Sequence, residues 1–110
     1  AVSVSSDCDK GFFDANLDYI AQTVDITAVG AMRVIKAFYP LLKKSEMTAL
    51  IMNISSEAGS ISKCYRTNLI DYGMAKAALN MATTLHCRIT ATSSWIRPSP
   101  SSFSIRTVFR

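Results

Sequence analysis

Apolar residues recur at steps of three and four along the first third of the chain. This spacing places them on one face and predicts a long amphipathic helix over residues 16–45. Asn16 or Asp14 is expected to cap its start with a side-chain oxygen. Pro40 is expected to kink or end it, because proline lacks a backbone N–H and its ring clashes with the preceding turn. The apolar face consists of Leu17, Ile20, Val24, Ala28, Met32, Ile35, Phe38 and Leu42.

The next apolar segment has a different pattern. TALIMNISS, residues 48–56, is apolar with almost no alternation, which predicts a strand covered on both faces, as in a parallel sheet. Residues 57–69 are polar without a steady period and indicate a loop. A second helix is predicted over residues 71–86, and His86 is expected to lie beside its C-terminal end. Its predicted apolar stripe is Met74, Ala78, Met81 and Leu85.

Helix, strand, loop and helix in this order form a piece of an α/β unit. A buried parallel strand needs neighbours on both edges, and residues 102–110 supply one candidate, reached by a right-handed crossover. We therefore predict a single α/β domain over residues 1–110 that is incomplete, with a partial, doubly wound parallel sheet. It divides into an N-terminal loop (1–13, with a candidate strand stub at 1–4), a core (14–86) and a divergent polar and basic tail (87–110).

Composition narrows the class of protein. A chain of 110 residues with 49% apolar composition supports one domain with a modest core. No run of 18 apolar residues is present, so we expect no membrane span, and residues 1–10 lack the pattern of a signal peptide. The three cysteines are far apart and form no CxxC pair, which favours free thiols in the cytoplasm over a zinc site. They are Cys8, Cys64 and Cys87.

The charge of +4 is unevenly distributed. All eight acidic residues lie at or before Asp71, whereas five basic residues and no acid follow it. This asymmetry is compatible with an anionic partner, and Trp95 and Phe103 could stack on nucleic-acid bases. With few aromatics and no nucleic-acid motif, we do not expect that function. The simplest interpretation of the Ser- and Thr-rich tail from Thr83 is a polar, flexible terminus. A shifted reading frame is the alternative, which the nucleotide sequence in the other frames would test.

Tyr72 and Lys76 are the first candidates for chemistry. Residues four apart share one face of a helix, so the two side chains are expected to be neighbours. A free phenol has a pKa of about 10, and a nearby ammonium lowers it, as general acid–base catalysis near neutral pH requires. Taken alone, this spacing is common on solvated helix faces.

Two serines strengthen this interpretation. Ser55 and Ser56 follow the predicted strand at its carboxyl end, where α/β sheets place their ligands. NISSEAG, then a loop, then YGMAKAALNMA resembles the catalytic half of the short-chain dehydrogenase/reductase family. VGAMRVIKAFYPLL, residues 29–42, resembles the helix that precedes this strand in the family. The resemblance extends over residues 12–84.

The resemblance implies a Rossmann-like fold, a cofactor and a set of roles. It implies hydride transfer between NAD or NADP and a small-molecule carbonyl or alcohol. Ser56 would hydrogen-bond the substrate oxygen, with Ser55 as second choice. Tyr72 would donate the proton in reduction and accept it in oxidation, and Lys76 would lower its pKa and hold the nicotinamide ribose. The family also implies a homo-oligomer that assembles through the helices at 16–45 and 71–86.

Three departures from the family pattern stand out. Thr27 takes the place of an asparagine that helps hold a water beside the lysine, although it could simply bond to its own helix backbone. The Gly-rich turn that receives the cofactor phosphates is absent, as is a Pro-Gly turn beyond the second helix. We therefore expect the fragment alone to be inactive. The alternative is a non-catalytic dimerisation module. Cys64 and Tyr65 lie in the loop over the expected site.

Overall fold

The computed structural model describes residues 10–45, 49–94 and 104–109, with side chains described for 10–45 and 49–88. The predicted strand stub at residues 1–4, Cys8, Trp95 and Phe103 lie outside these residues. A short 3₁₀ turn, Phe12–Asp14, precedes three helices and two strands. These are α1 (Leu17–Val24), α2 (Gly30–Lys43), β1 (Leu50–Ser55), α3 (Ile70–Ser94) and β2 (Ser104–Phe109).

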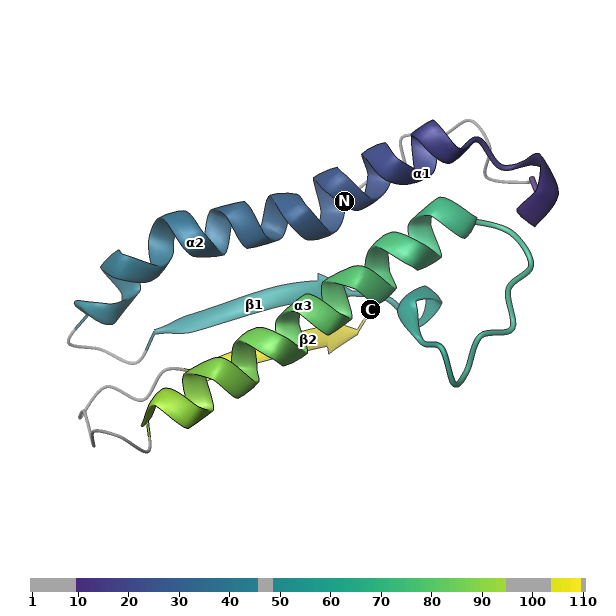
Figure 1. Cartoon of the computed structure of the whole chain (residues 1–110). Coiled ribbons are helices and arrows are strands. Elements are labelled where there is room, and N and C mark those ends of the chain that lie inside the picture. Colours follow the sequence, from purple (N-terminus) through teal and green to yellow (C-terminus); the bar gives the residue numbers. More distant parts are fainter. Residues whose placement is uncertain (1–9, 46–48, 95–103, 110) are drawn as a thin grey trace.

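The predicted first helix is present, but it contains an irregular turn. α1 and α2 follow one another along one side of the molecule (Figure 1), joined by a π-helical turn at Asp25–Val29. Asn16 caps α1, as predicted, and its Oδ1 accepts a hydrogen bond of 2.9 Å from the Asp18 N–H. Pro40 does not end α2, which continues to Lys43. A proline removes one backbone N–H from the helix, so a further partial turn can still follow it.

β1 and β2 form a parallel pair, which confirms the strands predicted within residues 48–56 and 102–110. The register runs from Leu50 opposite Ser104 to Ser55 opposite Phe109. The prediction that β1 is covered on both faces is wrong for the described residues. Leu50, Met52 and Ile54 alternate along the strand and are 50%, 52% and 58% exposed. One face of β1 is therefore open, while α3 lies alongside both strands (Figure 1).

α3 differs from the predicted second helix in length and in orientation. It does not end at His86 but extends to Ser94, because no glycine or proline interrupts residues 87–94. The predicted stripe does not form the buried face, since Met74, Met81 and Leu85 are 50%, 60% and 53% exposed. The buried face of α3 is instead made of Asp71, Ala75, Lys76, Leu79 and Thr83.

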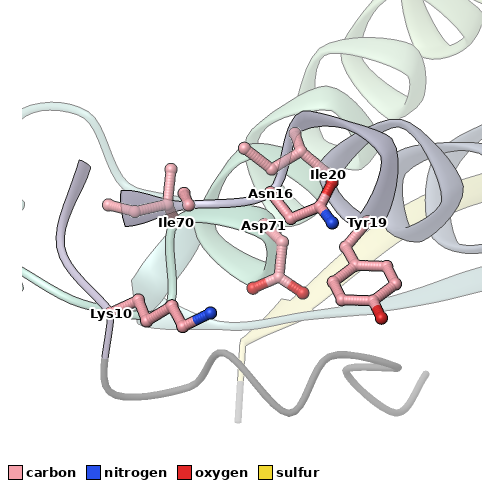
Figure 2. A pocket seen from close by; sticks show the side chains of 7 residues that line it. Lys10, Asn16, Tyr19, Ile20, Ile70 and Asp71 are labelled. Carbon is pink, nitrogen blue, oxygen red and sulfur yellow. The ribbon is translucent and has the colours of Figure 1, made fainter. Parts of the chain in front are cut away.

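Most side chains of this inner face are small or polar, with Leu79 as the exception, and the face packs against α1 and β1. Near its start, the Asp71 carboxylate accepts a hydrogen bond of 3.1 Å from the Thr23 hydroxyl of α1, and both residues are buried. Figure 2 shows this carboxylate facing a small pocket between the side chains of Lys10 and Tyr19. An acidic residue in the first turn also interacts favourably with the positive end of the helix dipole.

Thr83 joins the middle of α3 to β1. Its hydroxyl accepts a hydrogen bond of 2.9 Å from the Asn53 amide and donates one of 2.8 Å to the Leu79 carbonyl. Thr83→Val keeps the shape of the side chain but leaves the half-buried amide without this acceptor. We expect the free energy of unfolding to fall by about 1 kcal/mol.

Chemical denaturation of both proteins measures this difference. Thr84→Val is the matched control, because Thr84 is exposed and bonds to the Asn80 carbonyl of its own helix at 2.9 Å. Its substitution is expected to change stability by less than about 0.5 kcal/mol. Equal effects of the two substitutions would show that the bond to Asn53 contributes nothing.

Candidate active site

The two serines lie at the carboxyl end of β1, as predicted. Ser56 is buried, its backbone is extended, and it caps the 3₁₀ turn Glu57–Gly59 by accepting a bond of 3.2 Å from the Ala58 N–H. Ser55 is also buried, and its hydroxyl has no hydrogen-bond partner within the described part of the chain. The strand therefore ends in two hydroxyls, of which Ser56 begins the next turn.

Tyr72 and Lys76 lie together in the first two turns of α3. The Lys76 ammonium nitrogen is 5.5 Å from the centroid of the Tyr72 ring. Lys76 is only 4% exposed, and its Nζ donates a hydrogen bond of 2.9 Å to the Ile54 carbonyl of β1. An ammonium has three N–H donors, so two remain for other groups. The lysine thus brings a positive charge to the end of the strand that carries the serines.

Gly59 allows the turn after Ser56 to approach the helix that carries Lys76. A Cβ atom at this position would lie 2.7 Å from the Lys76 carbonyl carbon, 2.8 Å from the Lys76 Cβ and 2.9 Å from the Ala77 nitrogen. The Gly59 carbonyl also accepts a hydrogen bond of 3.3 Å from the Asn80 amide. Only a residue without a side chain fits here, and it brings the serine turn against the lysine.

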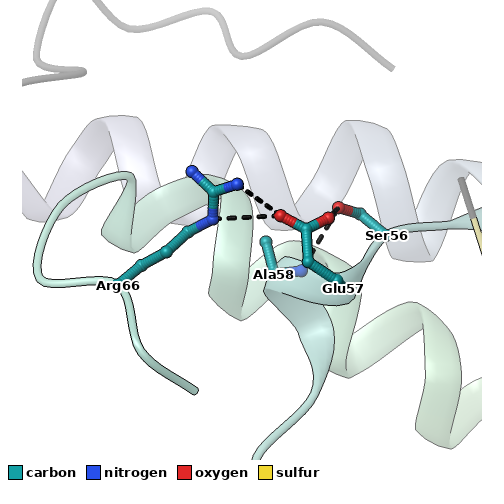
Figure 3. A network of polar contacts seen from close by, with 4 residues as sticks. All are labelled: Ser56, Glu57, Ala58 and Arg66. Carbon is teal, nitrogen blue, oxygen red and sulfur yellow. Dashed lines mark hydrogen bonds and ion pairs between the residues drawn. The ribbon is translucent and has the colours of Figure 1, made fainter. Parts of the chain in front are cut away.

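Glu57 and Arg66 form a part of the site that sequence reasoning missed (Figure 3). The Ser56 hydroxyl donates a hydrogen bond of 2.6 Å to Glu57 Oε2, and Arg66 Nε donates one of 3.1 Å to Oε1. A second Arg66 nitrogen, Nη2, also bonds to Oε1. These bonds, first that from Ser56 and then those from Arg66, lower the pKa of Glu57 to about 2. The one signal in the sequence was an acid directly after the serine.

Ser56 and Tyr72 are not joined directly. Among the described residues, the hydroxyl of Ser56 bonds to Glu57 and to the Ala58 N–H rather than to the tyrosine. The structure therefore brings together Tyr72 and Lys76, and it places Ser56 on the turn that packs against Lys76 through Gly59. The catalytic roles of the three residues stay predictions at this point.

Thr27 lies in the π-helical turn between α1 and α2. It is buried, and this turn packs against α3. Within the described residues, the threonines that bond back to their own helix are Thr83 and Thr84, and Thr27 is not among them. π-helical turns frequently occur at functional sites. Whether Thr27 replaces the usual asparagine beside the lysine stays a prediction.

The other residues singled out in the sequence are His86, Tyr65 and Cys64. His86 does not lie at a helix end, because α3 continues to Ser94, and its ring meets that of Tyr39 on α2 in a T-shaped contact at 5.7 Å. Tyr65 is 73% exposed. Cys64 and Arg66 line an open pocket beside the first turns of α3, together with Ile61, Leu69, Met74 and Ala77. Within the described residues, Cys64 and Cys87 form no disulfide. No helix in the described residues is long and apolar enough to cross a membrane.

A family model and solved structures match most of this chain. A family model described as enoyl-(acyl carrier protein) reductase matches residues 1–93. A solved short-chain dehydrogenase/reductase from Burkholderia multivorans, with bound NADP, superposes on 96% of this chain with a TM-score of 0.68 at 20% identity. The chain belongs to the short-chain dehydrogenase/reductase family. The resemblance seen in the sequence is thereby confirmed.

Other relatives show how much of each protein the match covers. A short-chain alcohol dehydrogenase from Burkholderia multivorans superposes on 99% of the chain, with a TM-score of 0.67 and 23% identity. Two uncharacterized oxidoreductases of Schizosaccharomyces pombe are each 44% identical over 52 residues, which are 47% of this chain and 20% of theirs. This short-chain dehydrogenase/reductase segment covers 41% and 44% of the two solved chains. The likeness to them shows an α/β fold of the family, and the complete doubly wound sheet stays a prediction.

Proposed function

We propose that this chain supplies the catalytic segment of an NAD(P)-dependent oxidoreductase that interconverts a carbonyl and an alcohol in a small-molecule substrate. One observation carries the proposal. Lys76, buried beside Tyr72 on α3, donates a hydrogen bond to the Ile54 carbonyl of β1, directly before the two serines, so the tyrosine–lysine pair and the serine hydroxyls lie toward the same end of the sheet. In α/β sheets, this carboxyl end is where ligands bind.

Each residue has a role that its surroundings support. Tyr72 donates a proton to the substrate oxygen in reduction and accepts it in oxidation. Ser56 hydrogen-bonds the same oxygen and keeps it near the phenol. Lys76 already uses one N–H on the Ile54 carbonyl, and its two others are free to bind ribose hydroxyls. The nicotinamide, when bound, supplies the hydride.

The residues present fit one end of a dinucleotide. Among the described residues, the buried Lys76 ammonium has N–H donors that are unused and the Ser55 hydroxyl has no hydrogen-bond partner, and both suit the polar ribose of NAD or NADP. The relative with bound NADP supports this cofactor class. For the phosphates, however, the four glycines of the chain, at positions 11, 30, 59 and 73, are too far apart to form a Gly-rich turn.

A second proposal is a module that associates through its helices, with or without catalysis. α2 and α3 carry apolar side chains on open faces, which is unusual unless another surface covers them. Phe38 and Leu41 on α2 are 55% and 62% exposed, and Met74 and Met81 on α3 are similarly open. A homo-oligomer formed by these helices would cover both faces. Cofactor binding and turnover separate the two proposals, because association alone requires neither.

The test of the catalytic proposal needs a complete enzyme. This is either a longer protein that carries the chain or a chimera in which the first half of a family member brings the Gly-rich turn. Oxidation of NADH or NADPH is followed with a panel of aldehydes and ketones. The proposal predicts carbonyl-dependent oxidation of at least one cofactor. A correctly folded complete enzyme with no such activity would contradict it.

The chain of 110 residues alone is expected to bind NADPH weakly or not at all. The reason is that no Gly-rich turn within it presents backbone N–H groups to the cofactor phosphates. Titration with NADPH, followed by protein fluorescence, measures the affinity. The complete enzyme serves as the positive control. Micromolar quenching by NADPH in the chain alone would show that this expectation is wrong.

A further inference from the structure

α3 begins directly after a residue with an unusual backbone conformation. Leu69 has a φ of 57°, and it is the one non-glycine residue with a positive φ in the described part of the chain. This left-handed region brings the Cβ atom close to a backbone carbonyl, so residues other than glycine rarely adopt it. Such a conformation persists where the surrounding structure holds it, and it often marks a functional region. The first turn of α3 therefore needs interactions that fix it from outside the loop.

The hydrogen bond between Thr23 and Asp71 is an interaction of this kind. The Thr23 hydroxyl donates it to Asp71 Oδ2 at 3.1 Å, and the two residues are 48 positions apart in the sequence. Thr23 is 1% exposed and Asp71 is 5% exposed. A hydrogen bond to a carboxylate contributes more than one between neutral groups, and it is costly to lose where both partners are buried. The pair thus ties the first turn of α3 to α1.

The same turn carries the tyrosine of the candidate site. Asp71 directly precedes Tyr72 in the sequence. The Gly73 N–H donates a hydrogen bond of 2.9 Å to the Leu69 carbonyl, which encloses both residues in one helical turn. One turn later, the Lys76 ammonium is bonded to a carbonyl of β1 at 2.9 Å. The half-buried tyrosine therefore lies between an attachment to α1 and an attachment to β1.

We propose that Asp71, held by Thr23, is a positioning residue that fixes the phenol of Tyr72 for proton transfer. The proposal rests on the proposed function for the role of Tyr72. Asp71 acts through the backbone of the first turn of α3, which carries both side chains. A shift of about 1 Å in a reacting group can lower a rate by about a hundredfold, so an anchor one residue from the phenol affects turnover. Cofactor affinity depends on Lys76 instead, which has its own bond to β1.

Two substitutions of Thr23 separate this role from simple packing in the complete enzyme. Thr23→Val keeps the shape of the side chain and removes the hydroxyl, whereas Thr23→Ser keeps the hydroxyl and removes a methyl group. We expect Thr23→Val to lower kcat by about tenfold, with cofactor affinity nearly unchanged, and Thr23→Ser to keep most of the turnover. Steady-state kinetics and a cofactor titration measure the two quantities. A larger loss of turnover in Thr23→Ser than in Thr23→Val would assign Thr23 to packing and overturn the proposal.

Two further variants show whether the effect belongs to the bond with Asp71. Thr84→Val is the matched control, because it removes an exposed hydroxyl from the same helix, and its turnover is expected to stay unchanged. In an Asp71→Ala background, Thr23→Val is expected to cause no further loss, since the acceptor is already gone. A further tenfold loss in that background, or an equal loss in Thr84→Val, would overturn the proposal.

A second experiment follows the first turn of α3 in the chain itself and needs no activity. Hydrogen exchange at the Gly73 N–H reports the bond to the Leu69 carbonyl. The Gly59 N–H is the internal control, because its bond of 3.1 Å to the Ser56 carbonyl closes the serine turn, away from Thr23. We expect Thr23→Val to accelerate exchange at Gly73 by about tenfold and to leave Gly59 nearly unchanged.

The outcomes distinguish this proposal from the proposed function. Equal acceleration at Gly73 and Gly59, or none at Gly73, would overturn the positioning role even in a fully active enzyme. A folded complete enzyme without carbonyl-dependent activity before any substitution would overturn the proposed function, and with it any part of Asp71 in turnover. Faster exchange confined to Gly73, together with a lower kcat that Thr23→Ser restores, would support both.

Discussion

Replacing Tyr72 by phenylalanine is expected to lower the turnover of the complete enzyme by about a hundredfold to ten-thousandfold while leaving cofactor affinity nearly unchanged. The substitution removes the phenol oxygen that moves the proton. It keeps the ring beside which the Lys76 ammonium lies at 5.5 Å. It also keeps the hydrogen bond from the Lys76 ammonium to the Ile54 carbonyl, because that bond does not involve Tyr72.

Steady-state kinetics and a cofactor titration on the same preparation measure the two quantities. Tyr19→Phe is the matched control, because Tyr19 lies on α1, is 38% exposed, and lines the small pocket at Asp71 rather than the serine turn. It loses the same atom from the same type of side chain, and turnover is expected to stay near that of the unsubstituted enzyme. Full turnover in Tyr72→Phe would refute the acid–base role, and equal losses in both variants would point to a structural effect.

Gly59→Ala is expected to lower the free energy of unfolding by about 3 kcal/mol. The added methyl group would meet the Lys76 carbonyl carbon, the Lys76 Cβ and the Ala77 nitrogen at 2.7, 2.8 and 2.9 Å. Two of these atoms belong to the backbone of α3, so rotation of a side chain cannot relieve the contact. Either the serine turn or the helix must move, and the distance between Ser56 and Lys76 changes with it.

Gly11→Ala provides the comparison for this change. A Cβ atom at Gly11 would meet nothing within 4 Å, and no glycine in the described residues has a positive φ. Both variants lose the conformational freedom of a glycine, but only Gly59→Ala introduces a steric clash. Chemical denaturation of the chain measures the stability of each. A Gly59→Ala protein as stable as Gly11→Ala would mean that the turn and the helix are not in close contact.

The elements that the sequence predicts well are those with a local cause. Asn16 caps α1 because a short polar side chain precedes a periodic apolar segment. The apolar run at residues 48–56 forms β1. Tyr72 and Lys76 share a helix face because they are four residues apart, and this alone brings the phenol and the ammonium together. Ser56 follows directly from its place at the end of the strand.

The orientation of α3 could not be predicted from hydrophobicity. Large apolar residues suggest a core-facing stripe, yet Met74 and Met81 are exposed. The inner face is set by partners far away in the sequence, since Asp71 bonds to Thr23 and Thr83 to Asn53. The hydrophobicity of a residue does not indicate whether its polar side chain has a hydrogen-bond partner on another helix or strand.

The pairing of Glu57 with Arg66 was hidden for a similar reason. The loop over residues 57–69 has no period, and Lys63 offers a second positive charge in it. The path of the loop decides which positive side chain reaches the carboxylate. The neighbouring residues in the sequence do not determine that path. The end of α3 was missed because Ser and Thr are poor helix formers but do not break a helix, so the helix continues to Ser94.

The bond from Lys76 to the Ile54 carbonyl also has an entropic consequence. A lysine on a protein surface carries about 2 kcal/mol of rotamer entropy, which a ligand must overcome when it orders the side chain. Here the ammonium is buried and held at 2.9 Å by the strand before any ligand arrives. The side chain therefore loses this rotamer entropy when the protein folds, and not when a ligand binds. A ligand that uses the remaining N–H groups therefore meets a preorganised cation and keeps more of its interaction energy as affinity.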